Sequence, residues 1–419
     1  MTNLIDPWIL FNFMQVDNVV WYYNINQEQE WNNSKVFPTV KDLQQWELVK
    51  QQEQQLFFMA RAEDCVILRH DPDPIFLSYL EENGIILPQF RRISENLEGL
   101  ENEQGSGILI PYINSENIFN EEQINTFSIF GSSPKLVKYL NNKFNTRKWA
   151  ITHNIPVTRG FFCYNSEDLQ HAYQVLREEG FQKVVLKIPY GSSGKGLRIL
   201  ENEKQFFSLL RFIQRRGHAF EFLLEGWHTI DRSLNSQLLI QDEGCHLLAI
   251  TEQIIDENGV YTGTNYTPRY DDDLLERYQL DIIKIGELLY EDGYRGILGI
   301  DSVLDREGKL FPIIEFNARF TQATYLLSLI TKLSLKYTYI ESRFVRFELT
   351  EEHSFDSIRK KLECVIEPEA DDGFLIYTFG KFTTEIRTYY RVFILFYGKQ
   401  RKNVEKMTSR FMQNNFSIF

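Results

Sequence analysis

Polar and charged side chains alternate with apolar ones in the segment IIEFNAR, residues 313–319. Side chains two positions apart in a strand share a face, so Glu315, Asn317 and Arg319 should point the same way. The upstream segment GILGIDSVL is expected to pair with it and to supply Asp301. Carboxylate and amide oxygens bind Mg²⁺ that also contacts nucleotide phosphates. The pattern predicts Asp301, Glu315 and Asn317 as metal ligands; the alternative is an edge strand with a solvated polar face.

A glycine-rich stretch, VVLKIPYGSSGKGLRIL, covers residues 184–200. The P-loop pattern requires a glycine five residues before Gly194 and a Ser or Thr after the lysine, where this chain has Pro189 and Gly196. These differences argue against a P-loop NTPase. Because the glycines lie between two apolar segments, the stretch predicts a strand–loop–strand hairpin that covers a ligand.

Periodic apolar patterns predict the elements around these residues. The segment NSEDLQHAYQVLREEG is expected to be a helix with Ser166 as its N-cap and Gly180 at its end. EKQFFSLLRFIQRRG and DDLLERYQLDIIKIGELLYEDG predict two further helices. FEFLLEG, SQLLIQ and CHLLAITEQI predict strands, as do EDCVILRH and GSGILIPYI in the first 130 residues.

Composition limits the class of protein. A chain of 419 residues is long enough for two or three domains, and 43% hydrophobic with 25% charged residues is typical of a globular protein. No apolar run reaches a membrane-spanning length and the N-terminus has no leader pattern, so we expect a cytoplasmic protein without a membrane partner. The four cysteines form no C-x-x-C pair, which fits a reducing cytoplasm and argues against a cysteine zinc site. The net charge of −13 argues against nucleic-acid binding.

The order of these motifs resembles that of the ATP-grasp ligases over roughly residues 132–330. The resemblance implies an α/β (α+β) protein with the ATP-grasp fold, in which two subdomains sandwich ATP. It implies an N-terminal α/β pre-ATP-grasp domain (1–130), an ATP-grasp domain (131–345) and a small, basic C-terminal extension (346–419).

The resemblance also implies ATP and Mg²⁺ as cofactors and gives roles to particular residues. Lys143 and Lys187 would bind nucleotide phosphates, and Arg319, with Arg295 as a further candidate, would stabilise the transferred phosphoryl group. Glu315 and Lys187 are expected on exposed active-site faces. Asp231 is the nearest candidate for a ribose-binding acid. The remaining nucleotide-binding positions are the glycine loop (Gly191, Ser192, Ser193, Gly194, Gly196) and the adenine hinge (Glu225, Gly226, Trp227).

The chemistry implied by the family has two steps. A carboxylate attacks the γ-phosphate of ATP to form an acyl phosphate, and a nucleophile then displaces phosphate. In GVYTGTNYTPRY, Thr264, Asn265 and Arg269 are candidates for the acid-substrate pocket, with a plain surface loop as the alternative. A nucleotide-binding regulator without turnover, or a kinase-like protein that stops at phosphorylation, remains open.

The acceptor is predicted from the C-terminal charge. Residues 381–410 carry eight basic side chains and only two acidic ones, Glu385 and Glu405. A basic patch is a dock for an acidic partner, although a solvated surface is the alternative. The layout is similar to ligases of antibiotic pathways, including the butirosin type that loads glutamate onto an acyl carrier protein. We therefore expect an amino-acid carboxylate as substrate and a carrier-protein thiol as acceptor; the alternative is an amide with a small amine.

Overall fold

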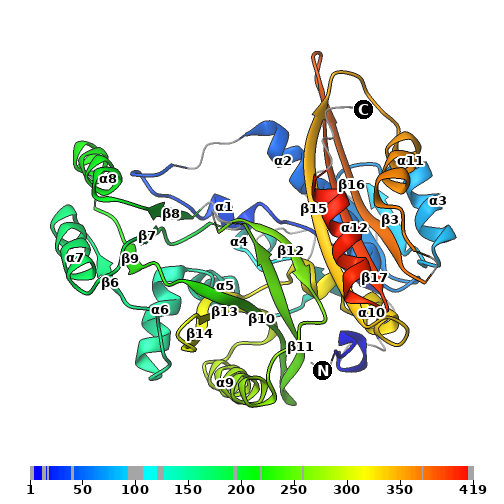
Figure 1. Cartoon of the computed structure of the whole chain (residues 1–419). Helices are drawn as coiled ribbons and strands as arrows, with labels where there is room; N and C mark the ends of the chain where they lie inside the picture. The colour runs from blue at the N-terminus through cyan, green and yellow to red at the C-terminus, as the bar shows by residue number, and fades with distance from the viewer. Residues whose placement is uncertain are drawn as a thin grey trace.

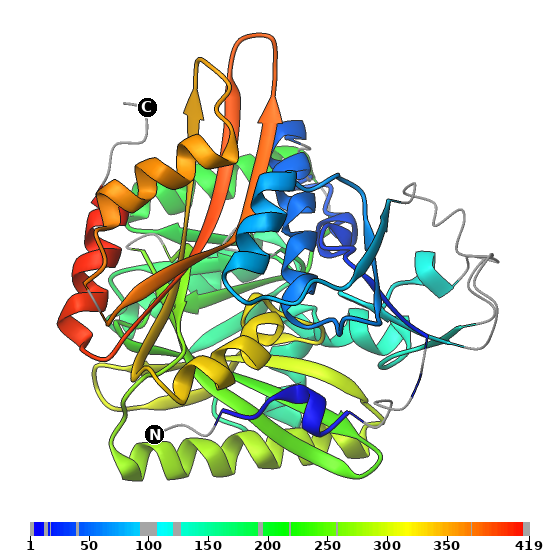
Figure 2. The same cartoon turned by 90° about the vertical axis from the view of Figure 1, so that its right-hand side faces the viewer.

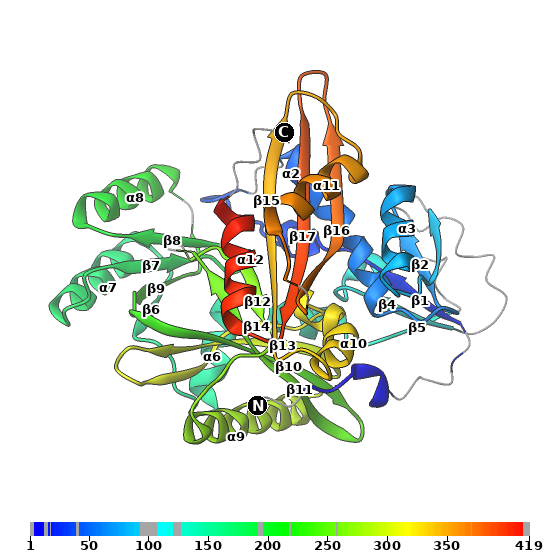
Figure 3. The same ribbon diagram turned by 45° about the vertical axis from the view of Figure 1, so that its right-hand side comes forward.

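The structure is a computed structural model that describes residues 4–11, 16, 18–38, 42–92, 107–119, 127–191, 196–217, 219–256, 259–369 and 371–413. Three sheets organise these residues. Figure 3 shows the N-terminal sheet on the right, a small sheet on the left and a large sheet between them.

The N-terminal sheet is parallel, with strand order β3-β2-β1-β4-β5. Its strands are β1 (Val19–Tyr22), β2 (Cys65–Leu68), β3 (Gln89–Arg92), β4 (Gly107–Pro111) and β5 (Phe127–Ile129). β2 and β4 confirm the two strands predicted in this region. The helices here are η1 (Pro7–Ile9), α1 (Gln27–Glu30), α2 (Leu43–Lys50), η2 (Gln51–Phe58), α3 (Pro74–Glu82) and α4 (Glu116–Phe119).

The small sheet has strand order β6-β9-β7-β8 and contains the predicted hairpin. Its strands are β6 (Gly160–Cys163), β7 (Val184–Lys187), β8 (Leu197–Leu200) and β9 (Phe222–Gly226), and β7 pairs antiparallel with β8. Helices α7 (Ser166–Glu178) and α8 (Glu203–Arg216) lie side by side (Figure 1). They pack together through the stacked rings of Tyr173 and Phe206, whose centroids are 3.8 Å apart. The N-cap of α7 is Asn165 rather than Ser166, because the Asn165 side chain accepts from the N–H groups of Glu167 and Asp168.

The large sheet has strand order β14-β13-β10-β11-β12-β15-β17-β16. Its strands are β10 (Ile230–Gln241), β11 (Gly244–Ile255), β12 (Tyr261–Asn265), β13 (Gly296–Asp305), β14 (Leu310–Asn317), β15 (Tyr339–Leu349), β16 (Gly373–Thr383) and β17 (Thr388–Gly398). The helices associated with it are α5 (Pro134–Leu140), α6 (Lys143–Thr152), α9 (Asp272–Glu291), α10 (Gln322–Ser334), α11 (Phe355–Ile366) and α12 (Arg401–Gln413). None of the helices in the described ranges is long and apolar enough to cross a membrane.

The C-terminal segment is part of the large sheet. β15 runs through the boundary expected at residue 345, and β17 and β16 continue the sheet beyond it (Figure 2). β15 also pairs with β12, so the C-terminal strands are joined directly to the strands that carry the polar motifs. Residues of this segment can therefore contribute to a site on that sheet.

Candidate active site

A cavity of about 330 Å³ lies between the small and large sheets. The small sheet lines it with Val185, Lys187, Leu197 and Glu225, and the hinge adds Gly226 and Trp227. The large sheet contributes Asp301, Glu315 and Asn317, followed by Arg319 just after β14. The predicted motifs, which are spread over residues 185–319, therefore meet in one space.

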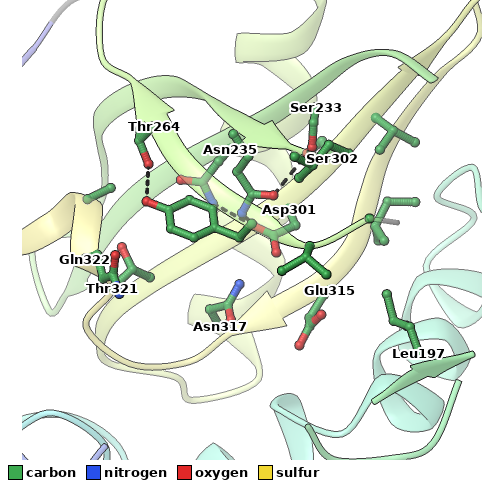
Figure 4. A pocket seen from close by; sticks show the side chains of 18 of the residues that line it. Leu197, Ser233, Asn235, Thr264, Asp301, Ser302, Glu315, Asn317, Thr321 and Gln322 are labelled. Carbon is green, nitrogen blue, oxygen red and sulfur yellow. Dashed lines mark hydrogen bonds between the residues drawn. The ribbon is translucent and has the colours of Figure 1, made fainter. Parts of the chain in front are cut away.

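The metal-ligand candidates face one another across paired strands. Asp301 on β13 lies directly opposite Glu315 on β14, and Gly299 lies opposite Asn317. Figure 4 shows the three polar side chains around the same part of the cavity, between Leu197 and Gln322. The amide groups of Asn235 and Gln253 donate to Asp301 Oδ1 at 2.7 and 2.9 Å and so hold this carboxylate in place.

These carboxylates fit a magnesium ion that is shared with phosphates. Burial raises the pKa of Asp301, against hydrogen bonds from Asn235 and Asn317 that lower it. Burial likewise raises the pKa of Glu315, although the Lys143 ammonium opposes the shift. A divalent cation between them would favour both charged forms. The described residues contain no group of three acidic, His or Cys side chains arranged to hold a metal ion, and Mg²⁺ bound with nucleotide needs only one or two carboxylates.

Lys143 reaches both the metal-ligand pair and the glycine loop. It is the first residue of α6, which Asn142 caps by accepting from the N–H groups of Phe144 and Asn145. Its Nζ donates to Glu315 Oε1 at 2.6 Å and to the Gly191 carbonyl at 2.7 Å. The side chain is only 4% exposed. This ammonium group neutralises charge at the metal-ligand pair.

Lys187 belongs to a buried ion network around Glu225. Lys187 Nζ lies 2.8 Å from Glu225 Oε2, and Arg147 Nη1 donates to Oε1 at 2.9 Å. Burial alone would raise the pKa of Glu225, but the charges of Lys187 and Arg147 outweigh it and lower the pKa. Glu225 thus positions two cations at the edge of the cavity. Lys187 is 8% exposed, whereas the sequence analysis placed it on an exposed face.

Arg319 has a partner that no sequence signal identified. Its Nη2 donates to Asn317 Oδ1 at 2.7 Å, and its guanidinium pairs with Glu28 Oε2 at 3.0 Å. Glu28 lies on α1 and is 1% exposed. The short segment NQEQEW around it is polar, so nothing in the sequence indicates that this carboxylate is buried. Glu28 fixes the guanidinium at the end of β14.

Asp231 and Arg295 are not brought to the cavity. Asp231 is exposed and lines a separate hollow, because the register of β10 shifts between Ile230 and Arg232 and turns this side chain away. Arg295 pairs with Asp242 at 2.8 Å and lies over the Tyr290 ring, before β13 begins. Of the glycine-loop residues, Gly191 and Gly196 are described; Ser192, Ser193 and Gly194 lie outside the described residues.

The expected acid pocket is only partly formed by the predicted loop. Thr264 lines the cavity, whereas Asn265 borders the separate hollow and Arg269 is exposed over the Tyr339 ring. The cavity instead receives Arg346 from β15 and Arg391 from β17. Both come from the C-terminal strands, which the sequence analysis treated as a basic extension.

The C-terminal basic residues do not form an unpaired patch. Acidic side chains from residues 348–371 neutralise most of them, and these acids lie outside the segment whose charge was counted. The ion pairs are Lys381–Glu352, Arg387–Glu348, Lys399–Asp371, Arg401–Glu405, Lys406–Glu369 and Arg410–Glu367. The basis for a carrier dock at this surface is therefore lost.

Comparison with known proteins gives four similarities. The ATP-grasp domain family matches residues 140–323. The chain is 40% identical over 380 residues, covering 90% of both chains, to the butirosin acyl-carrier protein–L-glutamate ligase of Niallia circulans. Its fold is similar to that of an ADP complex of N5-carboxyaminoimidazole ribonucleotide synthetase (TM-score 0.59, 13% identity, 94% and 96% coverage). It is also similar to phosphoribosylamine–glycine ligase of Thermotoga maritima (TM-score 0.57, 12% identity, 94% and 96% coverage).

Proposed function

Because this chain belongs to the ATP-grasp family of ATP-dependent carboxylate ligases, we propose that it transfers the acyl group of an amino acid to the phosphopantetheine thiol of an acyl carrier protein. The fold and enzyme class predicted from the sequence are confirmed by this membership, as are ATP and Mg²⁺ as cofactors. The single observation that carries the finer proposal is the 40% identity over 90% of both chains to a ligase of that specificity.

The proposed metal ligands are Asp301, Glu315 and Asn317. When bound, Mg²⁺ supplies charge stabilisation on the phosphate oxygens. Asp301 is already oriented by two amide donors, so little reorganisation is required of it. Lys143, which touches Glu315, would move its ammonium toward a phosphate once the metal satisfies that carboxylate.

Lys187 and Arg319 are proposed to hold phosphate oxygens from opposite sides of the cavity. Both cations are positioned by buried carboxylates, Glu225 and Glu28, and such fixed charges stabilise a phosphoryl transition state without reorganisation. At the other end, Val185 and Leu197 offer apolar contacts to an adenine ring beside Gly226 and Trp227. We assign no ribose role to Asp231, since it borders the other hollow.

The acceptor is tested by intact-mass spectrometry of a holo carrier protein incubated with the enzyme, Mg²⁺, ATP and an amino acid. We expect the carrier to gain the mass of one aminoacyl group, because the thiol displaces phosphate from the acyl phosphate. The apo carrier, which lacks the thiol, is the control and should gain nothing.

Two other results would contradict the proposal. Acylation of small amines with no gain on the carrier would indicate an amide-forming ligase. Accumulation of a phosphorylated acid that no acceptor consumes would indicate a kinase-like enzyme instead.

A further inference from the structure

Two arginines face each other at the C-terminal side of the cavity. Arg346 on β15 and Arg391 on β17 are directly opposite partners in the antiparallel ladder, so their side chains share one face of the sheet. Both line the cavity that contains Asp301 and Glu315. The described part of β17 therefore delivers a guanidinium to the ligand space.

These arginines lack the counter-charge that the buried arginines Arg319 and Arg147 have. Arg319 pairs with Glu28 and Arg147 with Glu225, but within the described ranges no carboxylate lies at ion-pair distance from Arg346 or Arg391. Arg391 is 9% exposed, and its Nε has no hydrogen-bond partner there.

The surroundings of Arg391 make its charge costly without an anion, whereas Arg346 is exposed. The rings of Phe344 and Phe393 lie 4.9 and 5.1 Å from the Arg391 guanidinium. Burial, together with the charge of Arg346, lowers the pKa of Arg391 to about 10. Like charges directly opposite each other in a sheet repel, so an anion bound between the two guanidinium groups would offset the repulsion between Arg346 and Arg391.

Two buried polar atoms, on Gln322 and Tyr23, have no hydrogen-bond partner within the described residues. Gln322 lines the cavity and donates to Gln52 Oε1 at 2.8 Å, yet its own buried Oε1 has no partner within the described residues. The buried hydroxyl of Tyr23 is likewise unpartnered, and its pKa is raised chiefly by burial while Arg391 and Arg319 both act on it. The guanidinium groups of Arg346 and Arg391 can donate to a carboxylate, and the unpartnered Gln322 Oε1 can accept from an ammonium group.

The position of this pair fits the unactivated end of a substrate. Arg319, Arg346 and Arg391 line the same cavity, so the arginine pair and the proposed phosphoryl-transfer site share one ligand space. An acid whose reacting carboxylate lies at Arg319 would extend along the same cavity toward Arg346 and Arg391.

We propose that Arg346 and Arg391 bind the second carboxylate of the substrate and so select a dicarboxylic amino acid. This inference rests on the proposed ligase function and adds the residues that determine its specificity. Guanidinium groups can bind a carboxylate bidentately, and a site built for that contact rejects an analogue that lacks it. The phosphate of the phosphopantetheine arm has related anion chemistry, so the experiment separates the two sources.

The test is calorimetric binding of glutamate and glutamine to protein saturated with Mg²⁺ and a non-hydrolysable ATP analogue. Wild type should bind glutamate about 100-fold or more tightly than glutamine, because glutamine leaves the two guanidinium groups without an anion. In Arg346→Gln and Arg391→Gln this ratio should fall to within about threefold, with nucleotide affinity unchanged. The control is Arg343→Gln, on the same strand but bordering the separate hollow and paired with Glu341; it should keep the wild-type ratio.

Further variants and outcomes keep the inference falsifiable. If Arg391→Gln fails to fold, Arg391→Lys replaces it in the test. This variant should retain only part of the glutamate preference, since an ammonium group keeps the charge but cannot bind a carboxylate bidentately. Folded, nucleotide-binding variants that retain the full preference would overturn the inference. So would a raised KM for the holo carrier with an unchanged glutamate-to-glutamine ratio, which would assign the pair to the carrier's phosphate. A wild-type enzyme that binds glutamate but acylates no carrier would contradict the proposed function alone.

Discussion

Glu315→Gln should lower the rate of ADP release by about 10³-fold, because it removes one of the two carboxylates proposed to hold the metal. The amide can still accept a hydrogen bond from Lys143, whose Nζ now lies 2.6 Å from Glu315 Oε1. The fold should therefore persist. ADP release and circular dichroism are measured together on the purified variant.

The matched control is Glu307→Gln, in the turn of the same β13–β14 hairpin. Glu307 is exposed and lies outside the cavity, so this variant should turn over like wild type. Wild-type turnover in Glu315→Gln would remove Glu315 from the metal site.

Lys187→Met should also reduce ADP release by about 10³-fold, since it removes a fixed cation from the phosphate site. The free energy of unfolding should fall by only about 1–3 kcal/mol, because Glu225 keeps its bonds from Arg147 and Thr158. Glu225→Gln should cost more, about 3–5 kcal/mol, because it leaves Lys187 and Arg147 buried without a carboxylate. Urea unfolding and ADP release are compared for both variants.

Lys183→Met provides the control for this comparison. Lys183 precedes the same strand, is exposed and pairs with Glu201 at the surface. Both its activity and its stability should match wild type. If Lys187→Met retained full activity, the lysine would serve only to neutralise Glu225.

The elements around the metal site were predictable because they follow local rules. Strand alternation placed Glu315 and Asn317 together, and the register of β13 with β14 put Asp301 opposite Glu315. The glycine-rich stretch between two apolar segments likewise predicted the β7–β8 hairpin. Each inference needed only neighbouring residues or one short hairpin.

Two expected site residues lie outside the cavity, and the regular alternation of the chain is interrupted near both of them. The register shift after Ile230 turns Asp231 out of the cavity, although Ser233 and Asn235 line it. Arg295 lies just before Gly296, whose φ of 123° redirects the chain at the start of β13. Neither irregularity can be read from residue types alone.

The residues that the sequence analysis missed come from distant parts of the chain. Glu28 reaches Arg319 from the N-terminal region, and Arg391 reaches the cavity from a strand that pairs across the sheet with Arg346. The count of charges in the C-terminal segment treated Arg391 like the surface lysines. Residue types alone do not show that Arg391 is buried in the cavity while the lysines form ion pairs at the surface. Most of the acidic residues that pair with these surface lysines and arginines precede the counted segment in sequence. Glu352, which pairs with Lys381, is an example.

Oxygen-isotope transfer tests the central claim, that the cavity activates a carboxylate through an acyl phosphate. The enzyme is incubated with Mg²⁺, ATP, a holo carrier and an amino acid whose carboxylate oxygens are ¹⁸O, and the released phosphate is weighed by mass spectrometry. Attack by the carboxylate leaves one of its oxygens on phosphorus, so the account predicts one ¹⁸O atom in each phosphate and release of ADP. Phosphate without ¹⁸O, or formation of AMP and pyrophosphate, would contradict it.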